Sequence, residues 1–261
     1  MQRSAPVARI AFAVAMITLG VIGLLYRDFE LVWGPLPSWV HGRTALACVC
    51  AAIALALGIL LLVRRTAATA SLWLVIYVAL WMLLVRLPSA IRHPLIEVTW
   101  ESWGEIALLL SGAWSIYADL RARTPVERER GLRFARVLFG LALIPIGLSH
   151  FAYLANTAGL VPSWLPFRRG WVYLTGTCHL AAALGSLLGV LPKLAAALES
   201  VMLGIFTVFV WIPLVVAQPR THGNWTEIWT SFALTVAAAV VAVHAPRRPR
   251  RPENAGPRLT T

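Results

Sequence analysis

The sequence predicts an all-α polytopic membrane protein of about eight transmembrane helices, arranged as two tandem, parallel four-helix bundles with both termini cytoplasmic. Composition is the first reason. Of 261 residues, 59% are hydrophobic and 13% are charged, and the mean hydropathy of +0.74 exceeds that of ordinary soluble domains. The second reason is a set of apolar runs, since a spanning helix needs about 20 mostly apolar residues. Eight segments approach this length: Ala8–Leu25, Thr44–Val63, Ser71–Leu87, Trp103–Tyr117, Phe134–Leu154, Trp171–Leu191, Leu194–Val216 and Ile228–Val243.

The third reason is an internal repeat. Pro37-Ser38-Trp39 recurs as Pro162-Ser163-Trp164, and Pro94 recurs as Pro219, in both cases 125 residues further on. Trp103-x-Glu105-Ile106 recurs as Trp225-x-Glu227-Ile228 at an offset of 122. Such ordered self-similarity indicates a duplicated unit. We therefore expect a first module over 1–118, a charged cytoplasmic linker over 119–133 that is partly helical from Pro125 onward, a second module over 134–245 and a basic, disordered tail over 246–261.

The elements are expected to be helices because their apolar runs are continuous, whereas the strands of a membrane barrel alternate apolar and polar residues. The first segment follows Arg3 and Arg9 and so resembles a signal peptide. We expect it to be retained, because no small-x-small cleavage site follows it and it has a counterpart in Phe134–Leu154. Each module then holds four helices with both ends on one side, which makes the modules parallel repeats.

Orientation follows from the basic residues of the loops. With eight spans, 16 of the 23 basic residues lie on the side of the two termini, which predicts that this side is cytoplasmic. Arginine outnumbers lysine 22 to 1, which favours a bacterial source and the inner membrane. The net charge of +12 then needs no nucleic-acid partner, because a basic tail beside the last helix is a topology signal that also attracts anionic lipid.

Two histidines are the sharpest chemical candidates. His150 falls late in the fifth predicted helix and His179 about midway along the sixth. At ~1.5 Å rise per residue we expect them to lie about 8–10 Å apart along the membrane normal, which disfavours ligation of one haem iron by both. An intramembrane histidine can relay protons or bind a quinone carbonyl. The alternative is a structural role, with each ring bonded to a backbone carbonyl or a nearby hydroxyl.

Carboxylates form a second group of candidates. Glu97, Glu101 and Glu105 follow one another at intervals of four residues and so share one helical stripe, and Glu105 has the counterpart Glu227. They either cap a helix start, where the macrodipole favours negative charge, or receive protons or a cation at the outer mouth. Glu199, inside the seventh helix, either pairs with Lys193 at the cytoplasmic boundary or takes up protons from that side.

The outer loops offer further candidates. Val161–Pro166, which contains Trp164, and the related Gly34–Trp39 are stiff and aromatic, and either cap the bundle or anchor it at the interface. Arg168 and Arg169 follow the second loop and suit an anionic group. No metal site is expected. Each of the three cysteines is expected to be a buried small hydrophobe, because none has metal-ligand spacing. The cysteines are Cys48, Cys50 and Cys178.

Three stretches of the second module resemble the DoxX-like membrane proteins: Ile146–Phe151, with its Gly-x-x-His-Phe ending, then Val161–Pro166, then Trp171–Gly176, which reads Trp-x-Tyr-x-Thr-Gly and includes Tyr173. The resemblance covers residues 134–243 well and residues 8–118 weakly, where the first module looks degenerate. It implies a four-helix bundle and, for some relatives, membership of membrane oxidoreductase complexes acting on sulfur compounds or quinones.

The function we expect is an integral membrane subunit of a redox system that binds a quinone or similar small ligand near the outer face. His150 would contact the ligand, His179 would relay protons and Arg168 and Arg169 would line the outer entrance. The partners expected are the bilayer and a membrane or periplasmic redox protein. Two alternatives stay open: a transporter or carrier of small metabolites or lipids, and a non-catalytic assembly factor. Whether the chain is itself an enzyme is left open by the sequence.

Overall fold

The computed structural model describes residues 4–29, 33, 36 and 40–245, and within them every regular element is a helix. In the described part of the chain, six helical stretches are long and apolar enough to cross a membrane, so the chain is a multi-pass membrane protein by composition and length. They are α1 (Ser4–Tyr26), α2 (Arg43–Leu62), Ala67–Arg92, α6 (Pro125–Ala152), Pro192–Ala217 and α11 (His222–His244). Two further long helices, α5 (Glu97–Arg121) and α8 (Arg168–Leu187), are more polar and fall outside this group.

Two of the apolar stretches contain a break of the same kind. Ala67–Arg92 consists of α3 (Ala67–Trp81), a π-helical turn and α4 (Leu87–Arg92). Pro192–Ala217 consists of α9 (Pro192–Phe206), a second π-helical turn and α10 (Ile212–Ala217). Pro88 and Pro213 come two residues after these turns end, and a proline inside a helix clashes with the carbonyl four residues earlier. The wider π turn relieves that clash in both places.

The segment expected to be a linker is mostly helical. α5 continues to Arg121 and α6 begins at Pro125, so only residues 122–124 separate the two helices. The start of α6 has strong local signals, because the Thr124 side chain accepts a hydrogen bond from the backbone N–H of Glu127 and Pro125 occupies the first turn. α5 likewise begins six residues before the expected Trp103, at Glu97.

The helix bounds repeat along the chain. α2 and α8, α3 and α9, the two π turns, and α4 and α10 are each displaced by 125 residues. The same offset relates two local side-chain hydrogen bonds at helix starts: the indole of Trp100 donates to Pro94 O, and that of Trp225 donates to Pro219 O. Our pairing of Trp103 and Glu105 with Trp225 and Glu227 at 122 is therefore wrong. It rests on a chance match of letters beside the true counterpart, Trp100.

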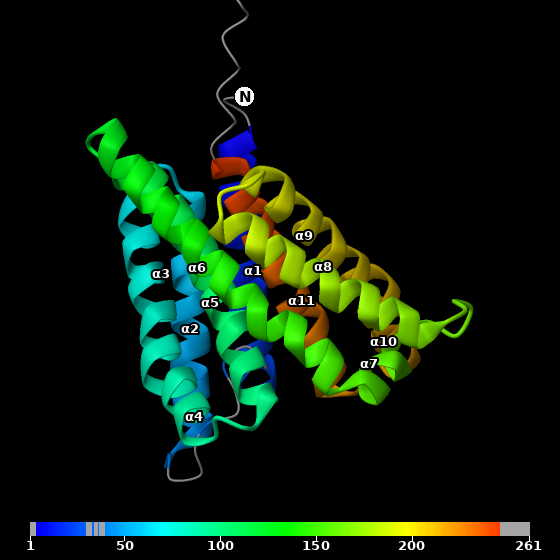
Figure 1. Cartoon of the computed structure of the whole chain (residues 1–261). Coiled ribbons are helices and arrows are strands. Elements are labelled where there is room, and N and C mark those ends of the chain that lie inside the picture. The colour runs from blue at the N-terminus through cyan, green and yellow to red at the C-terminus, as the bar shows by residue number, and fades with distance from the viewer. Residues whose placement is uncertain (1–3, 30–32, 34–35, 37–39, 246–261) are drawn as a thin grey trace, which may run out of the picture.

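The eight long helices pack as two similar groups (Figure 1). In the first, α1, α2, α3 and α5 pack in sequence, and in the second α6, α8, α9 and α11 do the same. The groups meet through α5 with α6, α1 with α11 and α5 with α11. At the centre Gly112 of α5 lies against Ala237 of α11, its own counterpart 125 residues on. Small residues there let the two backbones approach closely.

The bundle has two ends. The start of α1 and the end of α11 lie together at one end, which we call the terminal end, and the opposite one is the distal end (Figure 1). At the terminal end Asp119 of α5 accepts a 2.8 Å hydrogen bond from Arg128 of α6 and lies 3.5 Å from His244 of α11. These contacts hold the pKa of Asp119 at about 2, below its ordinary value, and fasten three helices to one another.

The tail over 246–261 and most of the loop between α1 and α2, including Pro37-Ser38-Trp39, lie outside the described residues.

Candidate functional site

A buried histidine–carboxylate pair lies inside the second group of helices. His179 of α8 and Glu199 of α9 are both fully buried, and Nδ1 of the ring lies 2.7 Å from Oε1 of the carboxylate. The second polar atom of each, Nε2 of His179 and Oε2 of Glu199, is also buried and has no hydrogen-bond partner. Glu199 thus pairs with a histidine rather than with Lys193. Two buried polar atoms without partners point to a group that binds there.

His150 of α6 lies directly beside this pair. Its ring centroid is 4.8 Å from that of His179, and Phe206 of α9 lies 6.3 Å from both rings. Its Nδ1 is 2.9 Å from the carbonyl of Ile146, and a carbonyl only accepts, so Nδ1 carries the proton and Nε2 holds a lone pair. The two histidines therefore present an acceptor nitrogen and an unsatisfied nitrogen in the same region.

The expected spacing of 8–10 Å between the histidines is wrong, since their ring centroids are 4.8 Å apart. The reason is the connection between their helices. α6 ends at Ala152, and α7 (Leu154–Leu160) with the turn after it carries the chain beyond that end before α8 begins at Arg168 (Figure 1). α8 therefore starts beyond the end of α6, and a residue midway along α8 meets the last turn of α6.

Glu101 of α5 extends the polar group toward the first module. The hydroxyl of Ser149, next to His150 in the chain, donates a 2.8 Å hydrogen bond to Oε1 of Glu101. Glu101 also lies close enough to His179 for their charges to interact. Sequence reasoning placed Glu101 on an acidic stripe but did not connect it to the histidines. Ser149 and Phe206 were missed, because no pattern marks one hydroxyl or one ring among many.

Glu105 and Glu227 belong to the distal side of the same region. Glu105 interacts electrostatically with Glu101, with Glu227 of α11 and with Arg86 of the first π turn. The carboxylates of α5 and α11 thus stand together where the two groups of helices meet.

The other predicted site residues lie apart from the histidines. Arg168 and Arg169 are exposed at the start of α8. Trp164 is exposed and packs edge-on against Phe209, and Tyr173 is exposed with its ring 6.0 Å from Phe151.

The cysteines differ from one another. Cys50 is buried as expected and Cys48 is partly buried, but Cys178 is exposed on α8, so the expectation of a buried residue is wrong there.

The first module provides a natural comparison for the pair. At the 125-residue offset His179 of α8 corresponds to Ala54 of α2, and Glu199 of α9 corresponds to Leu74 of α3. Ala54 and Leu74 are buried core residues. The same arrangement of helices is thus built without a histidine or a carboxylate at these positions, so the fold does not require them.

His150 also has an apolar counterpart. Gly20 of α1 and Gly147 of α6 make equivalent close approaches to α2 and α8, which aligns the two helices at an offset of 127. His150 then corresponds to Gly23. All three polar side chains are confined to the second module.

The first module fills the equivalent region with aromatic rings. Trp33, from the loop after α1, is buried with its ring 5.1 Å from Tyr77 and 5.8 Å from Trp81. Trp81 is the counterpart of Phe206, the ring that lies beside the histidines in the second module. The first module thus has packed aromatic rings in the region where the second module has His150, His179 and Glu199.

Among the described residues, no three histidine, cysteine, aspartate or glutamate side chains converge as metal ligands. Comparison with protein-family models, with curated proteins and with solved structures finds no match to this chain.

Proposed function

We propose that this protein is an integral membrane subunit of a redox system, in which the second module binds a quinone or a similar carbonyl-bearing ligand beside His150 and His179. The observation that carries the proposal is the buried His179–Glu199 pair, whose Nε2 has no partner. The first module replaces both residues with apolar ones, which argues against a packing role.

The chemistry assigned to each residue follows from its contacts. Glu199 at Nδ1 orients the ring of His179 and leaves Nε2 as the nitrogen that can contact a polar group of a ligand. A quinone bound here would accept two electrons from the redox partner and two protons. His179 Nε2 would hold a ligand carbonyl and hand on one proton, water at the distal surface would supply the other, and His150 Nε2 would accept a hydrogen bond from a hydroxyl of the reduced ligand.

In this proposal the chain crosses the bacterial inner membrane eight times, with the terminal end in the cytoplasm. α5 and α8 complete the eight spans, because each packs between apolar helices that are long enough to cross. His179 of α8 is then buried in protein rather than exposed to lipid, as intramembrane ionisable groups are. The distal end faces outward, which leaves His150 near the outer surface and available to a periplasmic or membrane redox partner.

The test is the quinone content of the detergent-purified protein, measured in a solvent extract. We expect about one quinone per chain in the wild type and a loss of most of it in His150→Ala and His179→Ala, since a ligand binds with defined stoichiometry. His93→Ala is the matched control, because His93 is an exposed histidine outside this group. Quinone at the level of the lipid background in the wild type would contradict the proposal.

A carrier for small metabolites or lipids is the second candidate, and one observation favours it. The two π turns before Pro88 and Pro213 interrupt helices at corresponding places of the two halves. Paired interruptions of this kind often mark the substrate site of a transporter. Flux of a substrate into vesicles without any bound redox ligand would favour the carrier. Silent histidine variants, combined with loss of a partner complex on deletion of the protein, would favour an assembly factor.

A further inference from the structure

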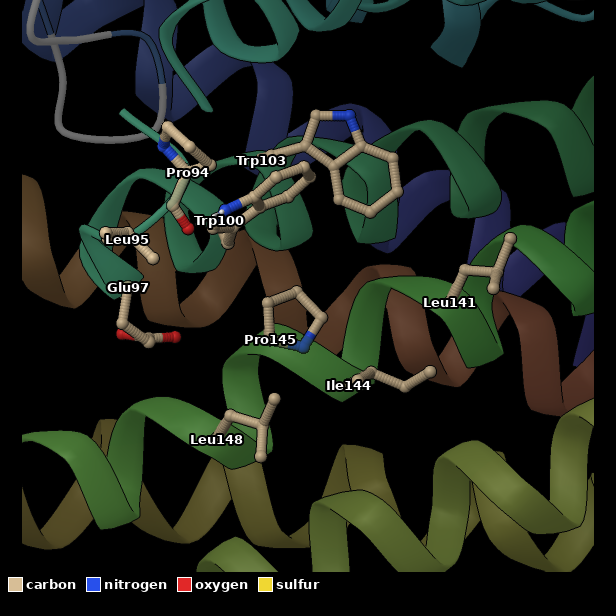
Figure 2. Close-up of a pocket in the computed structure, with 9 residues that line it drawn as sticks. All are labelled: Pro94, Leu95, Glu97, Trp100, Trp103, Leu141, Ile144, Pro145 and Leu148. Carbon is tan, nitrogen blue, oxygen red and sulfur yellow. Dashed lines mark hydrogen bonds between the residues drawn. The ribbon is translucent and has the colours of Figure 1, made fainter. Parts of the chain in front are cut away.

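A groove at the distal end lies between α5 and α6, apart from the histidines. It encloses about 410 Å³, within the range of small-molecule sites. Trp100 and Trp103 of α5 form one wall and Leu141, Ile144 and Leu148 of α6 form the other (Figure 2).

The groove faces the membrane. Leu141 and Leu148 are 42% and 46% exposed, on a helix apolar enough to cross the bilayer. The exposed side of such a helix meets lipid tails. A molecule reaching the groove therefore arrives from the bilayer.

The groove is not a general feature of the fold. α1 and α11 meet in the same way as α5 and α6, but there the rings of Tyr26 and His222 stack at 4.1 Å. His222 is the counterpart of Glu97, 125 residues earlier. The α1–α11 contact is thus filled by two stacked rings, whereas the α5–α6 contact has the Glu97 carboxylate beside an open groove.

The carboxylates and indole rings at the groove favour the binding of a cation. Glu97 lies at one end of the groove, and neither of its carboxylate oxygens has a hydrogen-bond partner (Figure 2). Glu101 adds a second negative charge one turn further along α5 and interacts with Glu97 electrostatically. The indole of Trp100 is fixed beside them by its hydrogen bond to Pro94 O. Carboxylates attract an ammonium group, and indole faces bind one through their negative quadrupole.

The apolar part of the groove runs away from Glu97. Trp103, Ile144 and Leu141 lie at the other end of the lined hollow (Figure 2). An elongated molecule thus has one orientation in which its charged head meets Glu97 and its apolar tail follows α6 into the bilayer.

We propose that this groove binds one phospholipid with an ammonium head, such as phosphatidylethanolamine. The ammonium group lies near Glu97, and an acyl chain lies between Trp103 and Ile144. An anionic head without an ammonium group is repelled by Glu97 and Glu101. The proposal is independent of the redox function, because the groove shares neither histidine.

The experiment is native mass spectrometry of the full chain released from nanodiscs that contain equal amounts of phosphatidylethanolamine and phosphatidylglycerol. We expect the wild type to retain one phosphatidylethanolamine preferentially. Glu97→Gln keeps the shape of the side chain and removes its charge, and it should reduce that preference about tenfold. Glu129→Gln is the matched control, because Glu129 is an exposed acid near the terminal end of α6. It should behave as the wild type.

A second variant tests the cavity itself. Ile144→Trp fills the groove without changing charge and should reduce retention of both lipids, and it also serves if Glu97→Gln does not fold. Equal retention of the two lipids by the wild type overturns the proposal. So does unchanged selectivity in Glu97→Gln, undiminished retention in Ile144→Trp, or a dimer of the chain in place of the lipid adduct. Quinone content measured on the same samples keeps this outcome separate from that of the redox site.

Discussion

Glu199 and His179 occupy places that the first module gives to leucine and alanine. A charged group at this depth is costly unless it is paired, and breaking a buried pair leaves one charge without compensation. Nδ1 of His179 lies 2.7 Å from Oε1 of Glu199. Each of these buried polar side chains is therefore stable in its position only while the other is present.

The pair predicts an uneven response to mutation. His179→Ala alone leaves the Glu199 carboxylate buried without a partner and should destabilise the protein by about 3–5 kcal/mol. The double variant His179→Ala, Glu199→Leu copies Ala54 and Leu74 of the first module and should unfold close to the wild-type temperature. Thermal unfolding of the three proteins in one detergent measures this. A double variant less stable than His179→Ala would refute the comparison between modules.

At the scale of helices, close packing depends on a few small residues and on polar contacts near the helix ends. Gly20 is the sharpest case, because a Cβ placed there would lie 2.6 Å from the backbone oxygen of Ala51 on α2. Backbone atoms cannot move aside as a flexible side chain does.

Gly20→Ala should therefore separate α1 from α2 and lower stability by about 1–3 kcal/mol, the usual cost of overpacking. Gly159→Ala is the control, because nothing lies within 4 Å of a Cβ added at that position of α7. Unfolding temperatures of the two variants check the difference. Equal and small effects would mean that the α1–α2 contact is looser than the structure indicates.

The contacts of Asp119 predict a pH dependence. Hydrogen bonds from His244 and Arg128 hold its pKa at about 2, below the ordinary value. The folded state therefore binds this proton less readily than the unfolded chain, and the stabilisation is complete above about pH 4 and is lost as the pH falls toward 2.

Asp119→Asn should cost ~1 kcal/mol at neutral pH after solvent screening, and little at the lowest pH. Unfolding temperatures of the wild type and the variant from pH 7 to pH 2 should converge. A difference that stays constant over this range would assign the effect to packing.

For the whole molecule, the sequence predicts the helices better than it predicts their contacts. Continuous apolar runs and proline positions are local signals, and long helices lie over each of the segments that these signals marked. The meeting of His150 with His179 depends on where α7 places the start of α8, and no local pattern encodes that position. The Glu101–Ser149 bond joins residues 48 positions apart and is equally invisible to periodicity. The redox function and its quinone stay predictions.

The packing of α1 against α11, which mirrors that of α6 against α5, has a consequence for the order of the chain. The start of α1, the end of α11 and the α5–α6 connection all lie at the terminal end (Figure 1). A circular permutant that begins at Ala122, with Thr261 joined to Met1, keeps every helix pair and the Thr124 cap of α6. It moves the chain ends from the α1–α11 contact to the equivalent α5–α6 contact. We expect this permutant to insert, to fold and to retain ligand at the wild-type level. If the permutant folds and retains ligand, the order of the two modules along the chain does not determine the fold.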